Sequence, residues 1–107
     1  FRLDSIENAS QYAAEVPFKV MQTAARTIDI IKAMIENGNK ASITDAGVGA
    51  LCCVTAIEGA YMNIRVNTKD LSDTNFADLL NQKAHNLLQE SKGELQALVE
   101  AVHKQIS

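Results

Sequence analysis

The chain has 107 residues, of which 47% are hydrophobic and 21% charged, a balance typical of one small globular domain rather than of a disordered segment. Its formal net charge of -3 comes from 13 acidic and 10 basic residues spread along the chain, so we expect no nucleic acid partner. No apolar run reaches the roughly 20 residues that span a bilayer, so we expect no membrane partner and a cytoplasmic location. Residues 1–107 are expected to form a single helical domain.

The first helical block is predicted to begin at Asp4, with Glu7 three residues later in a capping-box arrangement. Pro17 lacks a backbone N–H and restricts the preceding residue, so we expect it to bend or break this helix. Beyond Pro17, apolar side chains recur every three or four residues and predict a buried stripe that ends at Gly38, a C-terminal cap. The stripe consists of Phe18, Met21, Ala25, Ile28, Ile31 and Ile35.

The second block is predicted to begin at Thr44, whose hydroxyl suits an N-cap and places Asp45 in the first turn, where the helix dipole favours a negative charge. From Val48 to Ile64 the sequence is apolar nearly all round, which predicts a central helix buried on most sides. One face of this helix has small side chains in its middle and polar groups at both ends. This small-residue face consists of Asp45, Gly49, Cys52, Ala56, Gly59, Asn63 and Asn67.

Glycine costs about 1 kcal/mol relative to alanine inside a helix, so the glycines of this face need a compensating gain. We assign them to close packing against a neighbouring helix, from this chain or another. Because the other two blocks are too few to surround the central helix, we expect a homo-oligomer, a dimer or higher, that forms through it.

The third block follows Ser72 and Asp73, which offer caps, and its leucine-rich stripe predicts a long amphipathic helix. If continuous, this helix would span about 50 Å at 1.5 Å per residue, so we expect either a bend near Gly93 or an overhang that packs on a partner. Three helical blocks and no strand pattern indicate the all-α class. The expected architecture is a helical bundle of long antiparallel helices within a larger or oligomeric bundle.

Motifs for metals and nucleotides are absent from the sequence. It contains no glycine-rich phosphate loop, no H-E-x-x-H and no cluster of cysteine and histidine. We therefore expect no metal cofactor, and spacing alone assigns no chemistry.

Two stretches carry a resemblance to a known family. "AAEVPFKVMQTA" at 13–24 and "NGNKASITDAGVGALCCVTAIEGAYMNIRVN" at 37–67 resemble the formiminotransferase-cyclodeaminase family, specifically its cyclodeaminase domain and the related bacterial methenyltetrahydrofolate cyclohydrolases. The resemblance runs from about Ser10 to Asn81. It implies an all-α fold, a homodimer as the smallest functional unit, and a tetrahydrofolate derivative as substrate in the cytosol.

The resemblance also implies that part of the family domain is absent here. Family members are about twice as long and carry, upstream of the matching segment, a glycine- and serine-rich motif resembling P-x-P-G-G-G-S. This sequence lacks that motif, so we expect that the N-terminal half of the family domain is not included.

The implied reaction is either the closure of 5-formiminotetrahydrofolate to 5,10-methenyltetrahydrofolate with loss of ammonia, or the hydrolysis of 5,10-methenyltetrahydrofolate. Both need general acid-base catalysis at an amidine-like carbon. Asp45 fits the role of catalytic proton-transfer residue, with the dipole and cap position as its alternative explanation. Asn63, Arg65 and Asn67 are candidates for substrate binding, because arginine can hold a carboxylate tail with two parallel hydrogen bonds. For the two asparagines, capping or a buried hydrogen bond is the alternative.

Asp45 and the Asn63 end of the helix are about 27 Å apart at 1.5 Å per residue, so one chain cannot hold both in one site. An antiparallel partner helix would bring another chain's Asn63 to Asp45; otherwise the two ends serve different purposes. The alternative function is a non-catalytic helical assembly module that keeps the family's packing surface without its chemistry.

Overall fold

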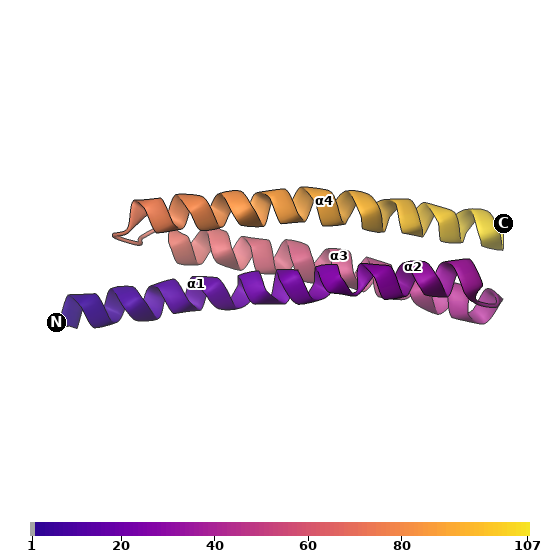
Figure 1. Ribbon diagram of the computed structural model, residues 1–107, viewed down its shortest axis with the longest axis horizontal. Coiled ribbons are helices and arrows are strands. Elements are labelled where there is room, and N and C mark those ends of the chain that lie inside the picture. Colours follow the sequence, from indigo (N-terminus) through magenta and orange to yellow (C-terminus); the bar gives the residue numbers. More distant parts are fainter. Residues whose placement is uncertain (1) are drawn as a thin grey trace.

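The computed structural model describes residues 2–107, which form four α-helices in an elongated bundle of 59 × 18 × 16 Å (Figure 1). Helices α1 (Arg2–Arg26) and α2 (Ile28–Asn37) follow one another almost in line. Helix α3 (Lys40–Thr68) returns beside them, and α4 (Thr74–Ile106) runs back along α3. Residues 2–107 contain no strand, and the prediction of an all-α bundle of long antiparallel helices is confirmed.

The hydrophobic core runs along the length of the bundle between α3 and the other helices. The predicted stripe of the first block contributes to it as expected, since four of its six members are buried and Phe18 and Ala25 are partly buried. The largest apolar side chains that are closed to solvent are Met21, Ile57, Ile64 and Leu95. The core therefore draws on α1, α3 and α4 together.

Pro17 neither bends nor breaks the first helix, so that prediction is wrong: α1 continues through Pro17, and the helix is interrupted only at Thr27, beyond which α2 continues almost in line. A proline cannot donate to the carbonyl four residues earlier, which here belongs to Ala13. The side-chain Nδ2 of Asn67, on α3, donates to Ala13 O at 3.1 Å. A side chain from another helix thus replaces the donor that Pro17 lacks.

Helix α3 begins earlier than predicted. Asn39 is its N-cap, because Asn39 Oδ1 accepts the Ser42 N–H at 2.9 Å. Thr44 lies inside the helix, and its hydroxyl donates to the Ala41 carbonyl at 2.9 Å. Asp45 therefore lies in the second turn, beyond the first turn in which the dipole effect is concentrated. The explanation of Asp45 as a cap or first-turn residue is wrong.

Glu7 does not form a capping box with Asp4, because its carboxylate binds the loop between α3 and α4. It accepts the Ser72 N–H at 2.9 Å and the Asp73 N–H at 3.1 Å. The Ser72 backbone N–H, the Gln11 side chain and the Asp73 N–H together lower the pKa of Glu7 below its ordinary value of 4.5. Asp73 caps α4, as predicted, by accepting a backbone N–H in the first turn of that helix.

Helix α4 is a single helix of 33 residues without the bend that we expected near Gly93. Ser91 and Leu95, on either side of Gly93, are both buried, and this packing holds the helix together where glycine alone would weaken it. The other helices run beside α4 along its length, so it has no overhang either (Figure 1).

Helix α3 is not covered on most sides within this chain. Val48, Met62 and Val66 are 60%, 62% and 71% exposed. A Cβ built on Gly49 or Gly59 would meet no atom within 4 Å, so neither glycine packs against another helix of this chain. We call this surface the open face of α3. It comprises Asp45, Val48, Gly49, Cys52, Thr55, Ala56, Gly59, Met62, Asn63 and Val66.

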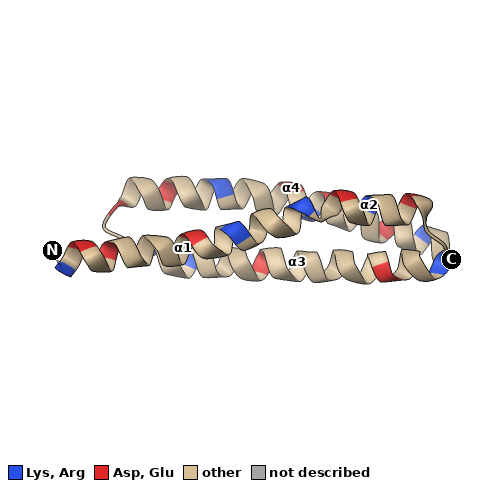
Figure 2. Ribbon diagram, turned by 60° about the horizontal axis from the view of Figure 1, so that its bottom comes forward, with Lys and Arg blue, Asp and Glu red and all other residues tan. Residues whose placement is uncertain are grey.

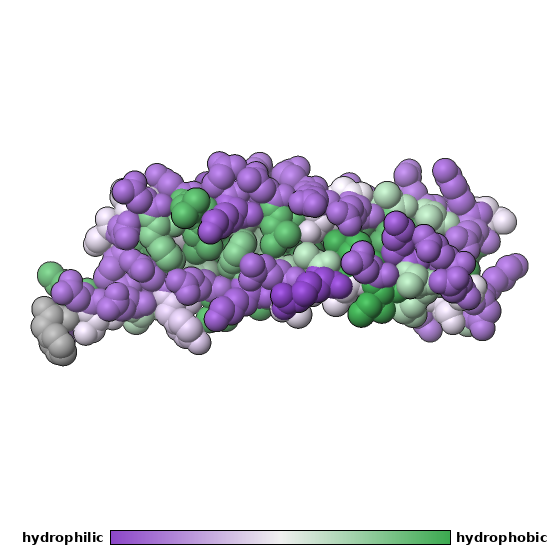
Figure 3. Space-filling view, in the orientation of Figure 1, coloured by the Kyte–Doolittle hydropathy of each residue, from purple (hydrophilic) through white to green (hydrophobic). Residues whose placement is uncertain are grey.

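Charge and hydropathy distinguish α3 from its neighbours. The outer surfaces of α1 and α4 are mainly hydrophilic, with apolar side chains in the groove between them (Figure 3). Charged residues are few along α3 (Figure 2). Among the described residues, α3 is the one helix whose length and mean hydropathy of 1.3 over a window of 18 residues would allow it to cross a membrane. Core helices of water-soluble proteins pass the same test of length and hydropathy. In this chain α3 packs against all three other helices, and 33% of the window is buried.

Candidate functional site

All four predicted site residues are exposed and lie on α3, at its two ends. Asp45 lies in the second turn, while Asn63, Arg65 and Asn67 lie in the last two turns. Because α3 is one unbroken helix, Asp45 and Asn63 are about 27 Å apart at 1.5 Å per residue. The fold of one chain therefore keeps the proposed catalytic residue away from the proposed binding residues.

Asp45 lies on the open face of α3, beside Val48 and Gly49. Within residues 2–107 its carboxylate makes no hydrogen bond and no ion pair. An exposed carboxylate without a protein partner is able to accept a proton from a bound molecule or from water. The surroundings of Asp45 in this chain are otherwise apolar or small.

The three residues at the other end of α3 do not form one cluster. Asn67 faces α1, where it supports the Ala13 carbonyl, and Asn63 lies one turn earlier on the same side. Arg65 points to the opposite side, towards α4. The structure thus gives Asn67 a structural hydrogen bond and separates Arg65 from both asparagines.

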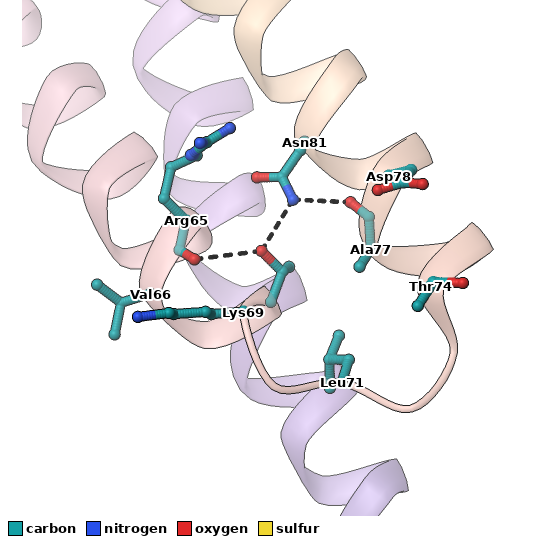
Figure 4. A pocket seen from close by; sticks show the side chains of 9 residues that line it. Arg65, Val66, Lys69, Leu71, Thr74, Ala77, Asp78 and Asn81 are labelled. Atoms are coloured by element: carbon teal, nitrogen blue, oxygen red, sulfur yellow. Dashed lines mark hydrogen bonds between the residues drawn. The ribbon is translucent and has the colours of Figure 1, made fainter.

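Arg65 lines a pocket of about 520 Å³ where α3, the following loop and the start of α4 meet (Figure 4). We call it the loop pocket. Its two cations, Arg65 and Lys69, are one helical turn apart, and Asp78 of α4 is its acidic residue. Neither cation forms a salt bridge within the described residues. The salt bridge found there joins Lys92 and Glu58, at 2.7 Å. The pocket is lined by Arg65, Val66, Thr68, Lys69, Leu71, Thr74, Ala77, Asp78 and Asn81.

Asn81 forms the inner wall of the loop pocket and has a fixed orientation. Its Nδ2 donates to Thr68 Oγ1 and to Ala77 O, both at 2.8 Å, and Thr68 in turn donates to Ile64 O at 2.8 Å. Asn81 Oδ1 is buried and has no hydrogen-bond partner among residues 2–107. Figure 4 shows that this oxygen points to the side of the pocket on which Arg65 lies.

The loop pocket was not predicted from the sequence. Of its lining residues only Arg65 was a predicted site residue, and neither Lys69 nor Asn81 was. The sequence did contain one signal. Asn81 directly follows Leu80 and comes three residues before Ala84, and both of these apolar residues are buried. A polar residue beside a buried stripe needs a partner, but the sequence does not show which one.

No group of three histidine, cysteine, aspartate or glutamate side chains comes together at any point of the described chain in a way that could hold a metal ion. The absence of a metal cofactor stays a prediction.

Comparison with known proteins places these features in a family. The family model for formiminotransferase-cyclodeaminase matches residues 1–86. The methenyltetrahydrofolate cyclohydrolase of Methylorubrum extorquens is 29% identical over 106 residues, which make up 99% of this chain and 51% of that protein. The formimidoyltransferase-cyclodeaminases of Rattus norvegicus and Sus scrofa are 29% and 31% identical over 91 residues, which make up 85% of this chain and 17% of each relative.

The chain spans about half the length of the cyclohydrolase that it matches and a smaller share of the two longer relatives. The matched residues include the whole of α1, α2 and α3 and the first part of α4, so both ends of α3 fall inside the family match. The chain belongs to the formiminotransferase-cyclodeaminase family.

Proposed function

We propose that this chain is part of a cytoplasmic folate-dependent enzyme that converts 5-formiminotetrahydrofolate to 5,10-methenyltetrahydrofolate and ammonia, or hydrolyses 5,10-methenyltetrahydrofolate. The observation that carries the proposal is the family match over residues 1–86, together with relatives named for these two activities. Both reactions take place at the same one-carbon unit, so one proton-transfer group serves either of them.

Asp45 is the proposed proton-transfer residue. In the closure reaction, N10 attacks the carbon of the protonated formimino group (–CH=NH2+), and the Asp45 carboxylate accepts the proton from N10. The same carboxyl returns this proton to the amino nitrogen, which leaves as ammonia, and the positive charge remains on the methenyl product. In the hydrolysis, Asp45 accepts the proton of the water that attacks the methenyl carbon. The support for this role is the exposed carboxylate of Asp45, which has no partner within residues 2–107.

The complete site is proposed to need a second copy of the chain. On the small-residue face, Asp45 and Asn63, Gly49 and Gly59, and Cys52 and Ala56 lie at equal distances in sequence on either side of residue 54. A two-fold axis beside residue 54 would therefore pair each of these residues with its counterpart on an antiparallel partner helix, as a symmetric dimer requires. This arrangement would cover the open face of α3 and would bring Asp45 to the partner subunit's Asn63.

Light scattering tests the association. At micromolar concentration the mass should exceed the 11.6 kDa of one chain, and Gly59→Leu should lower it towards that value by overpacking the contact. Gly93→Leu is the matched control, because Gly93 is also helical and also has no atom within 4 Å of a built Cβ, but lies on α4. A stable monomer, or equal masses for the two variants, would contradict association through α3.

The two reactions are distinguished by their products. Incubation with 5-formiminotetrahydrofolate should produce the absorbance of the methenyl compound together with ammonia if the chain is a cyclodeaminase. Incubation with 5,10-methenyltetrahydrofolate should abolish that absorbance if it is a cyclohydrolase. Because the chain spans about half of the Methylorubrum extorquens protein, a second assay uses a chimera in which the chain replaces the matching half of that relative.

A non-catalytic assembly module is the second candidate, favoured by the open face of α3 and by the length of the relatives. It predicts association through α3 without conversion of either folate, by the chain or by the chimera. Conversion by either preparation at a rate above that of the buffer would exclude this alternative.

A further inference from the structure

We propose that the loop pocket binds the two carboxylates of a folate's glutamate tail, with Arg65 and Lys69 as the cations and Asn81 as the residue that positions Arg65. This inference rests on the proposed function, because the ligand that it names is one end of the proposed substrate. Since Asp45 and Arg65 of one chain are about 30 Å apart along α3, the tail in one chain's loop pocket would belong to a substrate whose one-carbon unit lies at the partner subunit's Asp45. It adds Lys69 and Asn81 to the residues predicted from the sequence and assigns Arg65 to a defined cavity.

The charge of the pocket favours a dicarboxylate. Arg65 lies in the last turn of α3 and Lys69 is its C-cap, four residues later and about 6 Å further along the helix axis, and like charges at this spacing disfavour one another. No acidic side chain within residues 2–107 forms a salt bridge with either cation. Asp78 opposes an anion, but the lining with two cations and one acid keeps a net positive charge. A ligand with two carboxylates would relieve the repulsion and engage both cations.

The buried side-chain oxygen of Asn81 supports the proposal independently of the charges. A buried carbonyl oxygen without a donor is rare and needs an explanation. Asn81 cannot turn this oxygen elsewhere, because its Nδ2 is held by Thr68 and by the Ala77 carbonyl. Because Oδ1 is closed to solvent, a ligand in the pocket does not reach it. We therefore assign a neighbouring side chain, not the ligand, as the donor to Asn81 Oδ1.

Arg65 is the donor that fits. Figure 4 shows Asn81 Oδ1 directed to the side of the pocket where the Arg65 side chain lies. A guanidinium has five N–H groups, so one can be given to Asn81 while a parallel pair remains for a carboxylate. Asn81 would thereby hold the fork of Arg65 towards the pocket. Lysine has no planar fork, so Lys69 acts as the second, point-like charge.

The size and walls of the pocket suit a tail rather than a compact ion. A volume of about 520 Å³ is within the range of small-molecule sites and exceeds what one inorganic anion fills. Val66 and Leu71 offer apolar surface for the methylene groups between the two carboxylates.

The test uses p-aminobenzoylglutamate as the probe and nuclear magnetic resonance as the readout, with the Asn81 side-chain amide and the Arg65 Nε–H as reporters. Both signals should shift in a saturable manner at millimolar concentrations of the probe. p-Aminobenzoylglutamine, which has one carboxylate fewer, should bind about tenfold more weakly. Equal binding of glutarate would overturn the assignment to a folate tail. Equal binding of phosphate would reduce the site to an adventitious anion site and overturn the proposal.

Variants test the residues. Arg65→Gln and Lys69→Gln should each weaken binding of the probe about tenfold, while Lys32→Gln, which removes an equal charge from exposed α2, should leave binding within twofold. Arg65→Lys should also weaken binding, because it keeps the charge but loses the fork. The absence of saturable shifts, or unchanged binding in Arg65→Gln and Lys69→Gln, would overturn the proposal.

The positioning role of Asn81 has its own readout. Asn81→Ala should weaken binding of the probe when Arg65 is present and should have no further effect in the Arg65→Gln variant. Additive losses would mean that Asn81 supports the fold only, and urea unfolding of each variant shows whether the helices remain intact.

Failure of this inference is distinguishable from failure of the proposed function. A chain that binds the probe through Arg65 and Lys69 but converts no folate would refute the reaction and keep the pocket. An active enzyme in which both variants keep the wild-type KM for the folate would refute the pocket and keep the reaction.

Discussion

Replacing Asn67 by alanine in two backgrounds, with Pro17 and with Pro17→Ala, tests how α3 supports the proline inside α1. In the wild-type chain, Asn67 Nδ2 donates to Ala13 O at 3.1 Å, and residue 17 has no N–H for that carbonyl. In the Pro17→Ala background, the new backbone N–H is in place to bond Ala13 O as in any α-helix. The side chain of Asn67 should then matter much less.

The structure sets the magnitude of this effect. A typical intramolecular hydrogen bond contributes about 0.5–1.5 kcal/mol to stability. Ala13 and Asn67 are both exposed, so water can partly replace the bond and the lower half of this range applies. We expect Asn67→Ala to lower the free energy of unfolding by about 0.5–1 kcal/mol with Pro17 present and by close to zero with Pro17→Ala.

Urea unfolding followed by far-ultraviolet circular dichroism measures all four chains of this double-mutant cycle. The coupling energy between the two positions should equal most of the cost of Asn67→Ala. An equal loss of stability in both backgrounds would refute the proposed replacement of the missing donor. No loss in either background would instead leave Asn67 available for the substrate-binding role predicted from the sequence.

Two further predictions concern the glycines of α3 and the pH dependence of stability. At concentrations low enough for the chain to be monomeric, Gly49→Ala should raise the free energy of unfolding by up to about 1 kcal/mol, because within one chain its Cβ meets nothing within 4 Å. Gly47→Ala should gain less or lose stability, because its Cβ would lie 3.1 Å from a Val102 methyl. Equal effects of the two changes in urea unfolding would contradict this packing. Glu7, whose pKa is lowered in the fold, should stabilise the protein above its unfolded pKa, and this contribution should be lost as the pH falls through the lower folded value. The stability difference between wild type and Glu7→Gln should therefore shrink with acidification, and a difference that grows below about pH 4 would contradict the assignment.

The sequence predicted the features of the fold that depend on local periodicity. Met21, Ile28, Ile31 and Ile35 of the predicted stripe are buried because a three- and four-residue spacing fixes one face of any helix, whatever its partners are. The all-α class and the cap at Asp73 follow from similarly local signals.

The features that the sequence did not predict depend on residues far apart in the chain. Pro17 is tolerated because of a side chain on α3, and Glu7 binds backbone N–H groups of the loop before α4. Neither partner is visible in the sequence near these residues. The start of α3 was missed for a different reason, since Asn39 and Thr44 are both suitable caps and the sequence alone does not rank them.

The candidate site was predicted only in part for the same reason. Asp45 and Arg65 were selected because they lie in the stretch that carries the family resemblance, and the structure places them on different sides and at different ends of α3. Lys69 and Asn81 line the pocket of Arg65, but they come together only when α4 folds back against α3. Contacts of this kind depend on the packing of two helices rather than on a motif.

The most direct measurement of the central claim compares the rates at which wild type, Asp45→Asn and Asp29→Asn convert the folate substrate, followed by the absorbance of 5,10-methenyltetrahydrofolate. Asp29 is an exposed aspartate on α2, so its variant controls for the loss of one negative charge. If Asp45 transfers the proton, Asp45→Asn should lower turnover by about 100-fold or more with an unchanged helical spectrum, while Asp29→Asn should keep the wild-type rate. An Asp45→Asn variant as active as the wild type would remove Asp45 from the mechanism.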